Sequence, residues 1–141
     1  MDVRRLGAGD DAAVVAAQAL FDRPVLTEAT ARFLASPDHH LLVAYDDGVP
    51  VGFVSGVETT HPDKGTELFL YELAVAPAAQ GRGVGRALVR ALGGLAAERG
   101  CYGMWVAVDD GNAAALRTYA AAGGEATKPG TTVVEWRLGT N

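Results

Sequence analysis

The chain has 141 residues, 49% of them hydrophobic and 21% charged, which is typical of a globular domain and excludes a disordered chain. The net charge of −5 argues against nucleic acid as the main partner and suits a cationic substrate. The single cysteine excludes an internal disulfide and a cysteine-only metal site, and the three histidines show no ligand-like spacing for a metal. We expect one domain over residues 1–141, located in the cytoplasm, since the sequence has no signal-peptide pattern and no apolar run of membrane-spanning length.

The first forty residues predict one strand and two helices. The strand is expected over residues 3–6, and the helices over residues 12–21 and 28–34. Thr27 is the expected cap of the second helix, because a threonine side chain accepts hydrogen bonds from the first free amides.

A hairpin and a long strand follow. The apolar runs 41–45 and 49–58 flank Asp46-Asp47-Gly48, and an Asp-Gly pair in that position is a strong hairpin signal. Residues 59–66 are polar and are expected to form a loop, and residues 67–75 the next strand. Strict alternation along that strand would place Glu72 on one face with Leu68, Leu70 and Ala74.

The second half of the chain predicts a strand–helix–strand unit. A helix over residues 83–99 has an apolar stripe and ends at Gly100, the expected residue after its last turn. Residues 104–108 form a short continuous apolar run, which fits a parallel strand covered on both faces. A helix over 113–122 and a last strand over 132–138 complete the chain. The sequence therefore predicts a mixed α/β fold.

A glycine-rich turn joins the long strand to the following helix. It reads Gln80-Gly81-Arg82-Gly83-Val84-Gly85, and Arg86 follows. Such a turn offers free backbone amides and the positive end of a helix dipole to an anion, and glycine lets a phosphate approach. The dinucleotide fingerprint would need glycine in place of Arg86, and the P-loop pattern is absent. A pyrophosphate cradle is the prediction, with a turn that binds no ligand as the alternative.

This Q-x-x-G-x-G turn resembles the acyl-CoA-binding motif of the GCN5-related N-acetyltransferases. Asn112, Ala115, Tyr119 and Gly123 resemble that family's second motif, N-x-x-A-x-x-x-Y-x-x-x-G, except that Gly124 stands where the family usually has an aromatic residue. The resemblance implies acetyl-CoA as cofactor and an acyl-CoA N-acyltransferase fold whose central mixed sheet has two splayed parallel strands. The implied cofactor-binding residues are Leu73, Ala74, Val75, Gln80, Gly81, Arg82, Gly83, Val84, Gly85, Arg86, Asn112, Ala115 and Tyr119.

A closer resemblance concerns three segments, F-L-Y-E-L-A-V, Q-G-R-G-V-G and C-Y-G-M-W-V-A-V-D-D, which are similar to the type I aminoglycoside 3-N-acetyltransferases. It implies acetylation of the 3-amino group of a polycationic aminoglycoside, an antibiotic-resistance activity. Acidic residues outside the motifs, Glu58, Asp63 and Glu67, would then help to bind ammonium groups or would be ordinary surface charges. A homodimer is also compatible, because dimers are common in this family. Trp136 on the last strand would then lie in the interface or in the core.

The reaction needs a base, because a primary amine is mostly protonated at neutral pH. Glu72 is the first candidate, since an apolar strand face would raise its pKa, and the alternatives are an ion pair to an arginine such as Arg137 or simple exposure at the sheet edge. Asp109 is the second candidate, as base or as a ligand of the substrate ammonium, with Asp110 beside it, and plain turn chemistry as the alternative.

Two further roles come from the resemblance. Backbone amides around residues 73–75 would stabilise the oxyanion, and the Tyr119 hydroxyl would protonate the leaving thiolate. The structural alternatives are that Asn112 only caps a helix and that Tyr119 is only a packed aromatic residue. Other functions remain open at this point. They are acetylation of another small amine, a polyamine or a protein N-terminus, and a non-catalytic acyl-CoA sensor.

Overall fold

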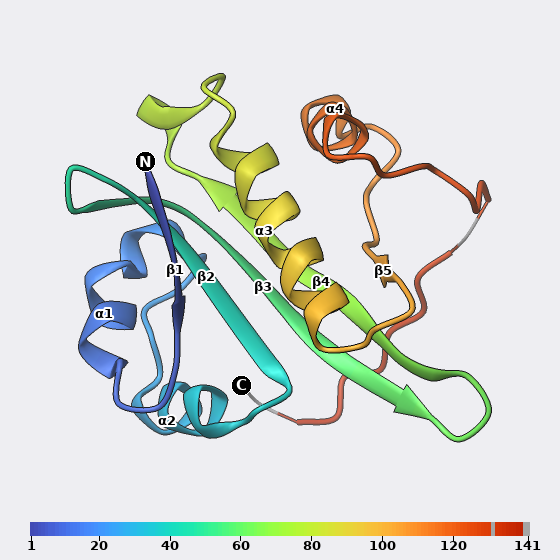
Figure 1. Ribbon diagram of the computed structural model, residues 1–141, viewed down its shortest axis with the longest axis horizontal. Coiled ribbons are helices and arrows are strands. Elements are labelled where there is room, and N and C mark those ends of the chain that lie inside the picture. Colours follow the sequence, from blue (N-terminus) through green and yellow to red (C-terminus); the bar gives the residue numbers. More distant parts are fainter. Residues whose placement is uncertain (131, 140–141) are drawn as a thin grey trace.

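Five strands form a mixed sheet, in which the first four strands pair antiparallel and the edge strand pairs parallel to the fourth (Figure 1). The computed structural model describes residues 1–130 and 132–139 of the chain. The strand order follows the sequence: β1 (Asp2–Leu6), β2 (His39–Asp46), β3 (Val49–His61), β4 (Gly65–Val75) and β5 (Met104–Trp105). The helices are α1 (Asp11–Ala16), the 3₁₀ turn η1 (Gln18–Leu20), α2 (Thr27–Ala35), the 3₁₀ turn η2 (Pro77–Ala79), α3 (Val84–Glu98) and α4 (Ala113–Ala121). The predicted mixed α/β fold is thus confirmed.

Helix α3 covers one face of the sheet. Its buried side chains are Val84, Leu88, Val89, Leu92 and Ala96, which recur at three- and four-residue spacing as the sequence predicted. They pack in one cluster with Leu42, Ala44, Val54, Leu68 and Leu70 of the sheet. Two glycines of β3 permit the close approach. A Cβ atom on Gly52 would lie 3.1 Å from Leu88, and one on Gly56 2.8 Å from Leu68 and 3.2 Å from Leu92.

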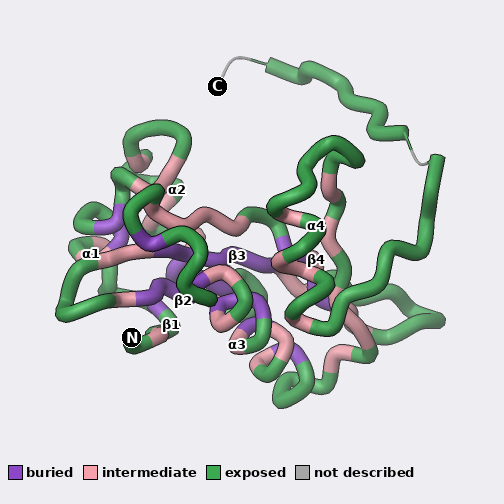
Figure 2. The backbone as a smooth tube through the Cα atoms, turned by 90° about the horizontal axis from the view of Figure 1, so that it is seen from above, coloured by how far each residue is buried: buried purple, intermediate pink, exposed green. Residues whose placement is uncertain are grey.

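The first two helices cover the opposite face, but only over β1 to β3. The second cluster of buried side chains joins Val14, Ala17 and Leu34 to Leu6, Leu41, Val43 and Phe53, and the part of β4 packed against it is Ala74. Buried residues therefore concentrate in the centre of the sheet, while the chain after α4 is exposed (Figure 2). Among the described residues, no helix is long and apolar enough to cross a membrane.

Local turn signals were reliable. Asp47 and Gly48 both adopt positive φ in the hairpin between β2 and β3, as the primed turns of hairpins require. Gly100 adopts φ +81° directly after α3, which is the left-handed conformation expected of a residue that ends a helix.

Four expectations about single elements were wrong. Thr27 does not cap α2, because the helix already begins at Thr27 and Leu26 is its N-cap. The expected loop over residues 59–66 is mostly strand, since β3 and β4 pair as far as His61 and Gly65 and leave a short turn. Cross-strand pairing extends both strands through polar residues, because one face of an antiparallel hairpin tolerates water.

The two other wrong expectations concern the edge of the sheet. The strand expected over 104–108 is confined to Met104–Trp105, and it is not covered on both faces, since Trp105 is 48% exposed. The strand expected over 132–138 does not form, and Trp136 is 76% exposed, so it does not lie in the core. A strand is stabilised by its cross-strand neighbours, and β5 is too short to offer such a partner.

Candidate functional site

The glycine-rich turn lies between η2 and the N-terminus of α3. Gly81 and Gly83 adopt φ of +76° and +83°, and Gly83 is the N-cap of α3. The Gln80 side chain donates to the Val75 carbonyl at 3.1 Å and so ties the turn to the end of β4. Since the first amides of a helix have no partner within the helix, the turn presents N–H groups of residues 84–86 toward an anion.

Arginines add positive charge around this turn. The Arg82 side chain is 65% exposed, and its contact with Asp46 is a long surface pair at 3.8 Å, which contributes little to stability. Arg86 is also exposed, and its guanidinium lies close to Gly83, so that a Cβ there would be 3.7 Å from Nη2. The backbone amides and the two guanidinium groups together fit a multiply charged phosphate group.

Gly85 has a packing role that the sequence reasoning missed. A Cβ atom at this position would lie 3.1 Å from the Thr118 methyl carbon, so the missing side chain lets α4 pack against α3. Arg90 of α3 strengthens this contact by donating to the carbonyl of Ala121, the last residue of α4, at 3.1 Å. The glycine was predicted as a phosphate ligand, and in the structure it positions the helix that carries Tyr119.

Strands β4 and β5 part soon after they meet. Their parallel pairing is confined to Leu68 with Met104 and Phe69 with Trp105, whereas β4 continues to Val75. The edge of residues 73–75 that faces away from β3 is therefore unpaired with β5. The splayed parallel strands implied by the family resemblance are thus present, next to the glycine-rich turn.

A β-bulge in β4 overturns the predicted orientation of Glu72. Ser55 of β3 pairs with Glu72 and its neighbour Gly56 pairs with Leu70, so Tyr71 is the extra residue. Beyond a bulge the faces of a strand exchange. Leu68 and Leu70 accordingly pack beneath α3, whereas Ala74 packs on the side of α1 and α2. Glu72, which alternates with Ala74, lies on that second face and not among the buried leucines.

Glu72 still has the electrostatics expected of a base. Glu72 is exposed on the surface, but partial burial and, next in size, the negative charge of Asp22 raise the pKa of its carboxyl. Asp22 follows η1, so the pairing of the two acids depends on the first helices and not on β4 alone. No ion pair between Glu72 and Arg137 occurs within the described part of the chain, and that alternative is not supported.

Asp109 and Asp110 follow β5 in an exposed segment. The Asp109 carbonyl accepts a hydrogen bond from the amide of Asn112 at 2.9 Å, which closes the turn into α4. The backbone of Asp109 thus has the turn role that was the alternative to a catalytic one, while both carboxylates stay accessible to a ligand.

Asn112 and Tyr119 of the second motif both contribute to the packing and capping of α4. The Asn112 side chain accepts a hydrogen bond from the Ala115 amide at 3.1 Å, so Asn112 caps α4, as the structural alternative predicted. Tyr119 is half-buried against the cluster beneath α3, and burial raises the pKa of its hydroxyl. Gly124 donates to the Tyr119 carbonyl at 2.9 Å, and a Cβ there would lie 3.1 Å from that oxygen, which accounts for glycine in place of an aromatic residue.

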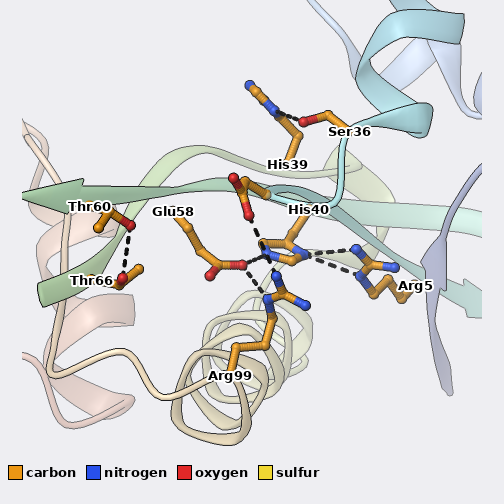
Figure 3. A network of polar contacts seen from close by, with 9 residues as sticks. Arg5, Ser36, His39, His40, Glu58, Thr60, Thr66 and Arg99 are labelled. Carbon is orange, nitrogen blue, oxygen red and sulfur yellow. Dashed lines mark hydrogen bonds and ion pairs between the residues drawn. The ribbon is translucent and has the colours of Figure 1, made fainter.

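A buried polar network on the α3 face was not predicted (Figure 3). His40 is fully buried, and its Nε2 lies 2.6 Å from the carboxylate of Glu58, whose side chain is 7% exposed. Arg5 donates to Nδ1 of His40 at 3.2 Å, which makes Nδ1 the acceptor and Nε2 the protonated nitrogen. Arg99, at the C-terminus of α3, also pairs with Glu58 and lies 3.5 Å from Asp38.

This network has structural consequences for two residues. Burial lowers the pKa of His40, and Arg5 adds to the effect against the opposing bond to Glu58. Burial alone would raise the pKa of Glu58, but hydrogen bonds from His40 and Arg99 outweigh it and lower that pKa. Glu58 is thus occupied inside the fold and does not support the polycation role. Asp63 pairs on the surface with His61 and Lys64.

Comparisons with known proteins bear on the fold and on the family. The sequence matches no curated protein. Among solved structures, an aminoglycoside acetyltransferase from an uncultured soil metagenomic sample, in complex with sisomicin, aligns over 99% of this chain and 96% of its own, with 19% identity and a TM-score of 0.84. The aminoglycoside N-acetyltransferase AAC(6')-Iy in complex with CoA aligns over 97% and 93%, with 22% identity and a TM-score of 0.76.

A third neighbour has a different acceptor in its name. The ribosomal-protein-alanine N-acetyltransferase from Brucella melitensis biovar Abortus aligns over 96% of this chain and 100% of its own, with 21% identity and a TM-score of 0.75. At these identities the neighbours show the fold alone. The family itself is shown by sequence, because the acetyltransferase (GNAT) family matches residues 12–123. With the glycine-rich turn and the parting strands in place, the chain belongs to the GNAT acetyltransferase family and its cofactor is acetyl-CoA.

Proposed function

We propose that the protein transfers the acetyl group of acetyl-CoA to a primary amine. The observation that carries the proposal is the parting of β4 and β5 beside the glycine-rich turn, with the raised-pKa carboxyl of Glu72 on β4. Acyl transfer from a phosphorylated thioester carrier needs a phosphate site, an open strand edge and a base close to one another.

The residues fit the cofactor at two places. The turn from Gln80 to Arg86 would hold the pyrophosphate through the first amides of α3 and through Arg82 and Arg86. The unpaired edge of residues 73–75 and the start of α4 would receive the arm that carries the acetyl group. When bound, acetyl-CoA supplies the acetyl thioester.

Glu72 takes the general-base role. Its raised pKa suits the removal of a proton from a substrate ammonium, directly or through one water molecule. Asp109 and Asp110 remain as exposed carboxylates that would attract the ammonium group. Backbone amides around residues 73–75 are the proposed donors to the carbonyl oxygen as it gains negative charge.

Tyr119 takes the general-acid role. Burial raises its pKa, so the hydroxyl holds its proton at neutral pH and has one to give to a departing thiolate. The ring packs against the core cluster beneath α3, which fixes the hydroxyl in position.

The acceptor class is supported by resemblance and by the names of the neighbours. Aminoglycosides are the first candidates, because one neighbour is bound to sisomicin and another to a bisubstrate analogue, CoA-S-monomethyl-acetylneamine. The 3-amino group remains a proposal from the sequence resemblance, and two neighbours carry a 6' designation instead. A protein N-terminus is the second candidate, since the Brucella neighbour is named for that acceptor.

The test is release of free thiol from acetyl-CoA by the purified protein with one amine at a time. Amine-dependent release that Glu72→Gln and Tyr119→Phe both reduce, with acetyl-CoA binding retained, is the expected result. Tight binding of acetyl-CoA without transfer to any amine would make the protein an acyl-CoA sensor.

A further inference from the structure

An aromatic groove lies on the sheet face that α1 and α2 leave uncovered. Its volume is about 370 Å³, and Phe33 of α2, His39 of β2, Val57 of β3, and Phe69 and Tyr71 of β4 line it. Such a volume is within the range of small-molecule sites. Figure 3 shows how the face arises at β2, since His39 points to one side of the sheet and His40 to the other, toward Arg99.

Aromatic rings stand on both walls of the groove. Phe69 stacks on Trp105 with ring centroids 4.4 Å apart and meets Tyr71 edge-on at 5.9 Å. On the other wall, Phe33 meets His39 edge-on at 5.4 Å. Tyr71 is 65% exposed and Trp105 48% exposed, so together with Phe69 they form a contiguous aromatic patch, the kind of surface that often marks a binding site.

Acidic and basic residues border the groove but do not line it. Among the described residues that line it, none is Asp, Glu, Lys or Arg. Glu72 follows Tyr71 directly and pairs with Ser55, which also lines the groove, and Asp22 lies near enough to Glu72 to influence its ionisation. Glu72 therefore borders a groove whose lining, apart from His39 and Ser55, is apolar.

We infer that this groove is the acceptor site and that it selects a primary amine carrying one ammonium group on a flat apolar body, such as an arylalkylamine. The inference rests on the proposed acetyl transfer and narrows its acceptor. A polyamine or an aminoglycoside would bring several ammonium groups to a groove whose own lining has no carboxylate. Each unpaired ammonium would lose hydration without gaining a partner. An aromatic body instead gains contact with Phe33, Phe69 and Tyr71.

The test compares phenylethylamine, spermidine and sisomicin as acceptors, by kcat/KM for thiol release and separately by calorimetric binding. Phenylethylamine is expected to have a kcat/KM at least about tenfold above the two polycations. Tyr71→Ala should lower that value by about tenfold, the scale of losing one aromatic contact. Tyr102→Ala is the matched control, since Tyr102 is similarly exposed at 59% but lies outside the groove.

The outcomes separate the inference from the function on which it rests. Binding of phenylethylamine that Tyr71→Ala weakens, without any acetyl transfer, would uphold the groove and refute the proposed function. Efficient acetylation of sisomicin or spermidine, unaffected by Tyr71→Ala, would uphold acetyl transfer and overturn the inference. Failure of every amine to bind, together with a dimer that Tyr71→Asp dissociates, would make the groove an interface between copies and also overturn it.

Discussion

The buried pair of His40 and Glu58 makes the most quantitative prediction. Both side chains are almost inaccessible, at 0% and 7% exposure, and Glu58 accepts hydrogen bonds from His40 and Arg99. Glu58→Ala leaves the Nε2–H of His40 buried without an acceptor. Leaving a buried polar group without its partner typically costs about 1–3 kcal/mol. We expect a loss of about 3 kcal/mol, at the upper end because Arg99 loses the same carboxylate partner.

Urea unfolding followed by circular dichroism measures this loss, and the thermal midpoint should fall by roughly 10 °C for a domain of this size. Asp63→Ala is the matched control. It also removes a carboxylate bonded to a histidine, but both side chains of that pair are exposed, at 64% and 66%, so no measurable loss is expected. A loss below about 1 kcal/mol for Glu58→Ala would refute the argument from burial.

The same pair determines how stability depends on pH. The folded pKa of Glu58 lies below its ordinary 4.5, so its contribution is present at neutral pH and is lost as the pH falls through the lowered value. The difference between wild type and Glu58→Ala should therefore persist at pH 7 and shrink below pH 4.5. His40, with a pKa lowered from 6.5, makes the folded protein less stable as the pH falls below 6.5 in both proteins. A difference that stays constant down to pH 3 would contradict this reasoning.

Three further predictions concern packing and the proposed chemistry. Gly56→Ala should destabilise the fold by about 1–3 kcal/mol, because the added methyl group overpacks the space between β3 and α3. Gly94→Ala should stabilise the fold by up to about 1 kcal/mol, because Gly94 lies within α3 with open space around it. Equal effects of the two substitutions in urea unfolding would contradict the contact geometry. Glu72→Gln should remove the acid limb of the kcat/KM profile, and Asp22→Asn should move that limb to lower pH, because it removes a charge that raises the pKa of Glu72; a profile unchanged in both variants would exclude Glu72 as the base. Tyr119→Phe should lower kcat by about 10²-fold or more while the thermal midpoint is kept; an unchanged kcat would leave the tyrosine as a packed aromatic only.

Short-range sequence patterns predicted much of the fold. The Asp-Gly hairpin, the apolar stripe of α3 and the glycine that ends it each depend on neighbours a few residues away, so one sequence suffices to predict them. The glycine-rich turn and the start of α4 were located for the same reason. The family match over residues 12–123 agrees with the motifs that suggested it.

The rest depended on contacts between distant segments. Nothing in an alternating sequence marks Tyr71 as the extra residue of a bulge, because the register of β4 is decided by its pairing with β3. The bulge moved Glu72 to the other face. Similarly, His40, Glu58 and Arg99 lie far apart in sequence, and Glu58 reads as an ordinary strand-end charge until the strands and α3 bring them together. The one available indication was the position of two adjacent histidines in β2, because neighbouring residues of a strand face opposite sides and one of the two had to face inward.

The glycines show a third kind of difference. The sequence assigned Gly81, Gly83 and Gly85 to one phosphate turn, and the structure adds a conformational or packing role for each. The first two supply left-handed turn conformations, and Gly85 supplies space for Thr118 of α4. Because a motif records residue types and not neighbours, only the packing of α3 against α4 separates these roles.

The central claim is acetyl transfer to an amine with Glu72 as base, and its most direct measurement is mass spectrometry of the acceptor after incubation with acetyl-CoA and either wild type or Glu72→Gln. The account predicts an acceptor heavier by one acetyl group with wild type, and a product rate reduced by roughly 10²-fold or more with Glu72→Gln at neutral pH. Acetylated product formed equally fast by both proteins would contradict the assignment of the base, and the absence of product from wild type with every amine would contradict acetyl transfer itself.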